Sequence, residues 1–333
     1  MRLSHFIFIG FLALAQLSFF KNEKAKPTSI SEEKGNEPYT GEPLCRNVVG
    51  LPNQKTSFCE DYIFDQTLYD LRLDTLKQVE FWRNIMNLQE DSSIVNLAVS
   101  RTVIERISNK DWNSKSDSLK SVYRDSIRSM HCLDTSQKIL ITSGKKFFYD
   151  FDKASQNFHK GINCFIANGV DPWYAQAILL IESPNKLQKS NAGAYGSFQL
   201  MKDVARMYGL KVNRHVDERA DFERSAYAAS SLIKKICIPY TKKMLDSLKI
   251  VNYNEHDLWF RLLVMHSYHA GAYNVQKALF ACNPCEGNME LVYSLWRTQT
   301  KRFKSASQNY SQLILAAMFE MDARRSELQL AKL

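Results

Sequence analysis

Residues 171–183 read DPWYAQAILLIES, a stretch with both a helix-start signal and a long apolar run. Asp171 can cap a helix start with its carboxylate, and Pro172 suits the first helical turn. The apolar run Ala177 to Ile181 then predicts a buried helix over residues 173–181. Glu182 follows this run directly, so an ionisable side chain stands at the C-terminal end of the predicted helix.

Glu182 combines two features that favour the protonated form of a carboxyl group. Burial removes hydration from a carboxylate, and the C-terminal end of a helix is partially negative. A carboxyl group that keeps its proton near neutral pH can act as a general acid on a glycosidic oxygen. The position also fits a glutamate at the exposed end of a buried helix, so the surrounding sequence has to decide between the two interpretations.

The sequence after Glu182 is rich in residues that start or stop helices. They are a loop at Gly193 and Gly196, a stop at Gly209, a cap at Asp221 and a stop at Gly271. Helices are expected from about Met201 to Met207, after Asp221, and over residues 259–269. Because no alternating strand is evident, residues 139–333 are predicted to form one mainly α domain.

Four short motifs follow one another over about 130 residues of this domain. They are Ile181-Glu182-Ser183, the loop AGAYGSFQLM at residues 192–201, Ser267-Tyr268-His269-Ala270-Gly271 with Asn274-Val275, and Asn309-Tyr310 before an apolar helix. In this order they resemble the lytic transglycosylase (SLT) family with the goose-type lysozyme-like fold, especially its exported, membrane-associated type. Residues 208–210 and 216–221 are also similar to landmarks of that family. The resemblance does not reach residues 21–138.

The resemblance implies an enzyme that binds peptidoglycan glycan strands and cleaves the β-1,4 bond between N-acetylmuramic acid and N-acetylglucosamine without water. Glu182 would be the sole catalytic acid and base: it protonates the glycosidic oxygen and then deprotonates the muramic 6-hydroxyl. That hydroxyl closes onto the anomeric carbon and leaves a 1,6-anhydro end. Most glycoside hydrolases need a second carboxylate, and none stands at a matched position. The mechanism requires no cofactor and no metal.

The resemblance also implies substrate-binding roles for five further residues. Ser183 matches a residue that contacts the acetamide group and supports the second step, and Gln199 matches a substrate-binding glutamine. Tyr310 matches the tyrosine that hydrogen-bonds the catalytic carboxyl group. Tyr268 and His269 belong to the third motif and complete the predicted substrate-binding set.

Three departures from the family pattern affect the predicted site. His269 stands where the family usually has Asn, and since an imidazole titrates near pH 6–7, we expect substrate contact to depend on pH. Pro184 rigidifies the exit from the first motif, and Ser197-Phe198 replaces the usual Leu-Met or Leu-Trp pair. Two alternatives therefore stay open: a muramidase-type hydrolase on the same fold, and a catalytically weak peptidoglycan-binding envelope protein.

The N-terminal part divides into three predicted segments. Residues 1–20 carry positive charge before an apolar stretch, and this stretch is shorter than the about 20 residues that a membrane-spanning helix needs. The pattern predicts an export signal that is either cleaved or retained as a short anchor. The protein is accordingly expected in the periplasm or cell envelope. Residues 21–44 are polar and predict a flexible linker.

Residues 45–138 are predicted to be a helical accessory region, through which an envelope protein partner would bind. Apolar residues recur there at helical spacing in two sets: Phe64, Leu68, Leu71, Leu76, Val79, Trp82, Ile85 and Met86, then Ile94, Leu97, Ala98, Ile104 and Ile107.

The net charge of the chain limits the kinds of partner that it is expected to bind. The 333-residue chain has 44 Lys and Arg against 35 Asp and Glu, a net charge of +9 that suits acidic partners. No aromatic platform accompanies its Lys pairs, and export disfavours a nucleic-acid partner, so no nucleic-acid binding is predicted.

The seven cysteines fit either three disulfides with one free thiol or buried thiols. His266, His269, Cys282 and Cys285 superficially resemble a zinc ligand set, but the spacing is unusual for zinc.

Overall fold

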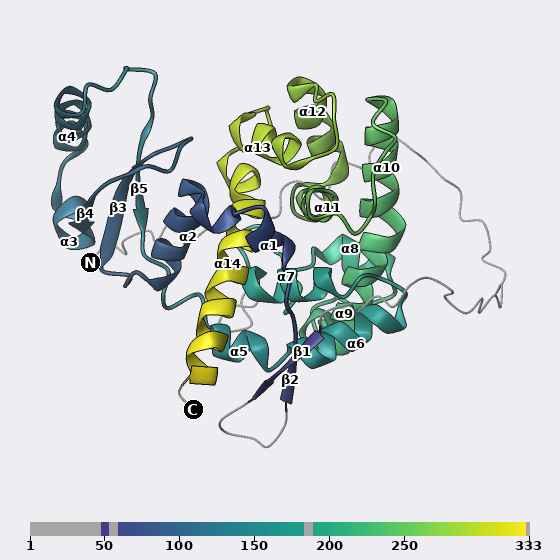
Figure 1. Cartoon of the computed structure of the whole chain (residues 1–333). Helices are drawn as coiled ribbons and strands as arrows, with labels where there is room; N and C mark the ends of the chain where they lie inside the picture. Colours follow the sequence, from purple (N-terminus) through teal and green to yellow (C-terminus); the bar gives the residue numbers. More distant parts are fainter. Residues whose placement is uncertain (1–47, 53–58, 183–188, 331–333) are drawn as a thin grey trace. The chain divides into compact units, whose positions relative to one another are not determined.

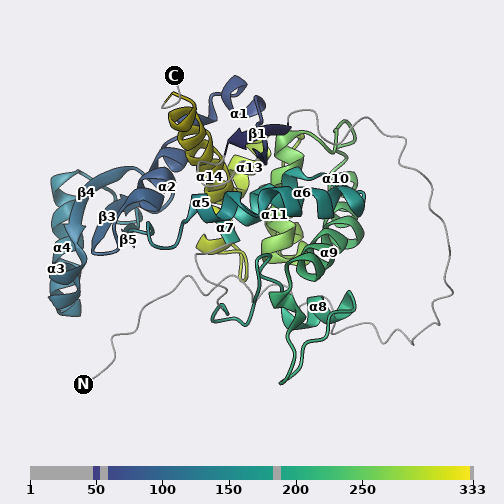
Figure 2. The same cartoon turned by 90° about the horizontal axis from the view of Figure 1, so that it is seen from below.

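The structure, a computed structural model, describes residues 48–52, 59–182 and 189–330 (Figures 1 and 2). The contacts within the chain divide these residues into two compact units. The first unit contains residues 48–52, 59–63, 158–176 and 189–310, and the second contains residues 64–157, 177–182 and 311–330. Two helices, α7 (Trp173–Glu182) and α14 (Ser305–Leu330), supply residues to both units.

The first unit is built mainly from helices. Besides parts of α7 and α14, its elements are the antiparallel strands β1 (Val48–Pro52) and β2 (Cys59–Ile63), the helices α6 (Phe158–Ala167), α8 (Lys202–Met207), α9 (Phe222–Leu232), α10 (Ile238–Ser247), α11 (Leu258–Ala270), α12 (Ala272–Cys282) and α13 (Met289–Arg297), a 3₁₀ turn at Glu218–Ala220 and a π-helical turn at Ile233–Cys237.

Local sequence signals set the ends of these helices as predicted. The carboxylate of Asp171 accepts a hydrogen bond from the Trp173 N–H at 3.0 Å, and Asp221 caps α9 by accepting from Arg224 N at 2.9 Å. Gly271 ends α11 with φ at 79°, a backbone conformation that favours glycine. The predicted helices over 173–181, 201–207 and 259–269 are confirmed within a residue or two.

Helix α11 forms the centre of the first unit. Every one of its residues is buried except Arg261, which is half-buried, so the helix is enclosed on all sides. Its neighbours are α10, α12 and α13, which lie around it in Figure 1. On another side of the unit, the small residues Ala226, Ala228 and Ala229 of α9 are fully buried and allow α6 to pack closely (Figure 2).

The second unit contains a sheet as well as helices. Besides parts of α7 and α14, its elements are α1 (Thr67–Asp70), a 3₁₀ turn at Leu73–Thr75, α2 (Lys77–Asn87), β3 (Ser92–Leu97), β4 (Val103–Ser108), α3 (Asn109–Ser114), α4 (Asp117–Met130), β5 (Ile139–Ser143) and α5 (Phe151–Ser155). The sheet is antiparallel with the strand order β4-β3-β5.

The sheet corrects two predictions made from the sequence. The second apolar set, from Ile94 to Ile107, lies in β3 and β4 and not in a helix. Strand β5 pairs with β3 in register Val95 to Ile141, so the predicted boundary at residues 138/139 cuts through one sheet and does not separate compact units. The accessory region is therefore a mixed helix and sheet structure, while the prediction of a mainly α protein is confirmed for the chain as described.

Polar contacts fix α2 to the C-terminal part of α14 within the second unit. The indole of Trp82 donates a hydrogen bond to Gln312 Oε1 at 2.9 Å. The carboxylate of Glu320 pairs with Arg83 at 2.7 Å and accepts from Asn87 Nδ2 at 2.7 Å. These contacts join residues more than 200 positions apart, so the last helix is part of the structure around α2.

In the described part of the chain, no helix is long and apolar enough to cross a membrane. The predicted export signal and linker lie outside the described residues.

A buried glutamine offers a test of this architecture. Gln176 of α7 accepts from the Ile63 N–H at 2.7 Å and donates to the Ile63 C=O at 2.9 Å, which fixes the end of β2. We expect Gln176→Met to lower the free energy of unfolding by roughly 1–3 kcal/mol, because two backbone groups lose their partner. Thermal unfolding followed by circular dichroism would measure this. The exposed Gln66→Met is the control, and equal effects of both changes would contradict the role of Gln176.

Candidate active site

Glu182 is the last residue of α7 and is buried, with 6% of its surface exposed. The apolar run Ala177 to Ile181 that precedes it is buried as well. At the other end of the helix, Asp171 is held by Arg261, whose Nη2 lies 2.7 Å from Asp171 Oδ2, and by His256 Nδ1 at 3.1 Å. Burial opposes ionisation of Asp171, but the hydrogen bond from His256 and the charge of Arg261 outweigh it and lower its pKa.

Tyr149 lies in the electrostatic environment of Glu182, within the second unit. Burial raises the pKa of Tyr149, and the charge of Glu182 raises it further. Its ring is buried and stacks on Phe151 with 6.1 Å between ring centroids. The phenol therefore stays neutral over the physiological range and adds a polar group to an otherwise apolar surrounding.

Gln199 lies in a tight loop of the first unit, one residue before the pair that closes the loop. Tyr195 and Leu200 form an antiparallel bridge across the loop, with both backbone hydrogen bonds at 3.1 Å. The backbone of Gln199 has φ at 45°, in the left-handed region that non-glycine residues rarely adopt, and its side-chain amide donates to the Gly196 C=O at 3.0 Å. A strained residue held in place by its surroundings is a common feature of functional sites.

Tyr268 connects this loop to the central helix. It lies on α11, and its hydroxyl donates to the Phe198 C=O at 2.6 Å. The ring of Phe198 is fully buried and stacks on Phe165 of α6 at 5.7 Å between centroids. The hydroxyl of Tyr268 therefore fixes the loop one residue before Gln199.

His269 stacks on Tyr310, with ring centroids 4.1 Å apart and an angle of 22° between the planes. Both rings are buried. Burial lowers the pKa of His269 to about 3, with a further contribution from neighbouring His266, whose own pKa burial lowers to about 4. The expectation that His269 titrates near pH 6–7 is therefore wrong: the imidazole stays neutral at any pH at which such a protein works.

The structure brings together four of the six predicted site residues. Gln199, Tyr268, His269 and Tyr310 lie in the first unit and are linked by the Tyr268–Phe198 hydrogen bond, the adjacency of Tyr268 and His269, and the His269–Tyr310 stack. Glu182 belongs by its contacts to the second unit. Ser183 and Pro184 lie outside the described residues.

The cysteine and histidine residues that superficially resembled a zinc set show no such arrangement. Over residues 59–182 and 189–330, no three His, Cys, Asp or Glu side chains are grouped to hold a metal ion. Cys282 is a free thiol that contacts Thr298 Oγ1 at 2.8 Å, and Cys285 is a free, exposed thiol.

Comparison with known protein families agrees with this geometry. Residues 166–281 match the transglycosylase SLT domain. An SLT domain implies a peptidoglycan transglycosylase type of activity with glycan strands as substrate. The matched segment contains Glu182, Gln199, Tyr268 and His269. No match was found among curated proteins or among solved structures.

Two residues that matter for the site were not assigned a role from the sequence. Tyr149 lies 33 positions before Glu182 and outside the matched segment, and no motif indicates it. Arg219 stands within the landmark at residues 216–221, but the sequence does not indicate which groups its side chain contacts. A basic residue among three acidic ones was the only available signal.

The buried His269 predicts how stability depends on pH. Its folded-state pKa of about 3 lies below the unfolded value of about 6.5, so between these values the unfolded chain binds more protons. Stability is therefore full above about pH 6.5 and falls as the pH drops from there. We expect His269→Asn to make this fall smaller, measured by chemical unfolding at about pH 7.5 and pH 5.

The exposed His131 provides the control for this measurement. His131→Asn should leave the pH dependence of the wild type unchanged. Identical slopes for the wild type and His269→Asn would contradict the lowered pKa.

Proposed function

We propose that this protein is a lytic transglycosylase that cleaves the bond between N-acetylmuramic acid and N-acetylglucosamine in peptidoglycan and forms 1,6-anhydro ends. The observation that carries the proposal is the burial of Glu182 at the end of the apolar helix α7, inside the segment that matches the SLT domain. A carboxyl group that loses hydration in this way is suited to hold and deliver a proton.

The proposed reaction uses Glu182 twice. In the first step its carboxylic acid gives a proton to the glycosidic oxygen, and the bond from that oxygen to the anomeric carbon of the muramic acid breaks. In the second step the 6-hydroxyl of the same sugar attacks the anomeric carbon and returns a proton to the carboxylate. The internal nucleophile takes the place of water and of the second carboxylate that hydrolases use.

The other predicted site residues receive supporting roles in this proposal. Ser183 contacts the acetamide group and Gln199 binds the glycan. The buried Tyr268 and His269 complete the substrate-binding set indirectly: Tyr268 holds the loop at Phe198, and His269 stacks on Tyr310. For Tyr310 we propose the role that the resemblance to the family implies, that of hydrogen-bond partner of the catalytic carboxyl group. A neutral His269 is compatible with its indirect role because it keeps one hydrogen-bond donor and one acceptor, where the Asn usual in the family has two donor hydrogens and one acceptor oxygen.

We propose the cell envelope as the place of action, because the substrate lies there. The pattern of residues 1–20 supports this, whether the segment is cleaved or retained as a short anchor. The mixed helix and sheet region at residues 64–143 is the part of the chain that we propose for an envelope protein partner.

The decisive experiment compares wild type and Glu182→Gln on purified sacculi. Wild type should release soluble 1,6-anhydro-muropeptides, identified by mass spectrometry. Glu182→Gln should lose at least about 100-fold of this activity, since an amide is far too weak an acid to protonate the glycosidic oxygen and a general acid supplies about that factor or more.

Glu223→Gln is the matched control, because Glu223 is an exposed carboxylate on α9 of the same domain. It should retain wild-type release. Reducing ends in place of anhydro ends would identify a hydrolase, and binding without release would identify a peptidoglycan-binding protein. Equal release by wild type and Glu182→Gln would contradict the assignment of the catalytic acid.

A further inference from the structure

Arg219 carries a buried positive charge next to the loop that presents Gln199. Only 3% of its surface is exposed. Its guanidinium group forms a two-pronged pair with Asp217, with Nε 2.8 Å from Oδ1 and Nη2 2.7 Å from Oδ2. The hydrogen bond from Arg219 lowers the pKa of Asp217, which stays ionised and balances the charge. A buried charge needs such a partner, because an unpaired one is costly.

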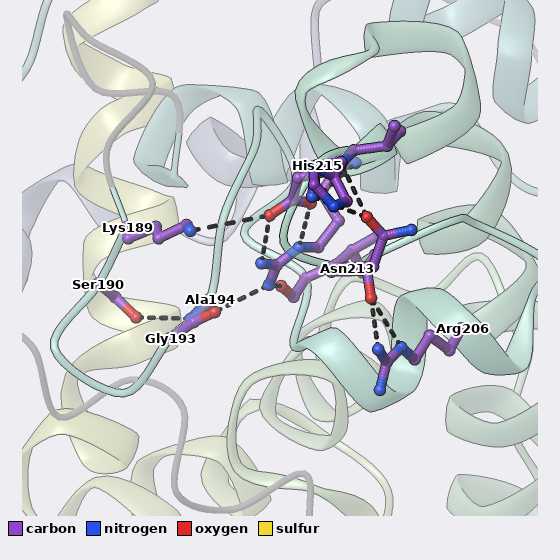
Figure 3. Close-up of polar contacts among 12 residues, drawn as sticks. Lys189, Ser190, Gly193, Ala194, Arg206, Asn213 and His215 are labelled. Atoms are coloured by element: carbon purple, nitrogen blue, oxygen red, sulfur yellow. Dashed lines mark hydrogen bonds and ion pairs between the residues drawn. The ribbon is translucent and has the colours of Figure 1, made fainter.

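The same guanidinium group holds both ends of the loop. Nη1 donates to the Gly193 C=O at 2.8 Å and to the Leu200 C=O at 2.8 Å, so one nitrogen joins backbone groups on either side of Gln199. The guanidinium carbon also lies 5.5 Å from the centroid of the Tyr195 ring. Figure 3 shows this end of the loop, with Gly193 and Ala194 beside Ser190 and with Lys189 reaching toward Asp217.

The backbone of Arg219 supports the loop as well. A Cβ atom on Gly196 would lie 1.9 Å from the Arg219 carbonyl oxygen, and Gly196 has φ at 87°. Only glycine allows this approach in this conformation. The loop therefore rests directly on the turn at residues 218–220.

That turn is itself fixed by its neighbours. Glu218 N donates to the Lys211 C=O at 2.9 Å, and Val212 and Asp217 form a β-bridge. The side-chain oxygen of Asn213 accepts from His215 N at 2.8 Å, and Arg206 of α8 donates to the Val212 C=O at 3.0 Å (Figure 3). Arg219 therefore connects the loop to a turn that its neighbours hold in place.

We propose that Arg219 is a positioning residue that holds Gln199 in its left-handed conformation for glycan binding. This inference rests on the proposed function, in which Gln199 contacts the glycan. The strained backbone at φ 45° persists because the clamp fixes Gly193 and Leu200 on both sides of it. Lysine cannot replace arginine here, because a single ammonium group cannot pair with Asp217 through two parallel bonds and bridge two carbonyls as well.

Binding to sacculi tests this proposal in the full-length protein carrying Glu182→Gln, so that no substrate is consumed. Gln199→Ala should weaken binding, and Arg219→Lys should weaken it by a similar factor of about ten. The double variant should bind no more weakly than either single one, since both changes remove the same contact. Arg297→Lys is the matched control and should leave binding unchanged, because Arg297 is an exposed arginine of α13 in the same unit and pairs with Glu290 on its own helix.

Independent losses that multiply in the double variant would show that Arg219 acts only on overall structure, and they would overturn the proposal. Unchanged binding in either single variant would overturn it too. Hydrogen exchange gives a second readout that needs no substrate: in Arg219→Lys the amides of Gln199 and Leu200 should exchange faster while those of α11 stay unchanged. If wild type releases no muropeptides, the proposed function fails, but this exchange result still decides whether Arg219 clamps the loop.

Discussion

The burial of α7 along its whole length is the constraint on which the candidate site depends. Protein encloses this apolar helix, and its last residue, Glu182, carries a carboxyl group although only 6% of the residue's surface is exposed. Moving a carboxylate out of water opposes folding unless the group is paired or protonated. Leucine at position 182 would avoid that cost. The general-acid role proposed for Glu182 gives this carboxyl group a use that packing of the helix does not require.

The ends of helices can be predicted from the sequence more readily than the pairing of strands that are distant in the chain. The ends of α7, α9 and α11 could be predicted, because a capping carboxylate or a glycine acts on its own helix within a few residues. The sheet could not be predicted from apolar spacing. Both faces of β3 are covered, so residues 93–96 are all buried and the alternation typical of a half-exposed strand is missing. The β-branched residues Ile94, Val95, Val103 and Ile104 were the overlooked signal.

The same distinction applies to the site. Motif order places Glu182, Gln199 and Tyr268 correctly on a helix end, a loop and a buried helix, because these are properties of short segments. The partners of Arg219 and the nearness of Tyr149 to Glu182 depend on how distant segments pack. Arg219 reaches back 26 positions to Gly193, and no spacing rule specifies that distance.

His269 shows why a departure from a family motif has to be judged by its surroundings. In water an imidazole would add a charge near pH 6, and a substrate contact made by it would then depend on pH. Stacked on Tyr310 and shielded from solvent, the ring stays neutral. A neutral imidazole and a carboxamide can each donate one hydrogen bond and accept another. The exchange of Asn for His thus changes shape and stacking area while it conserves charge, so this departure gives no reason to expect a different chemistry.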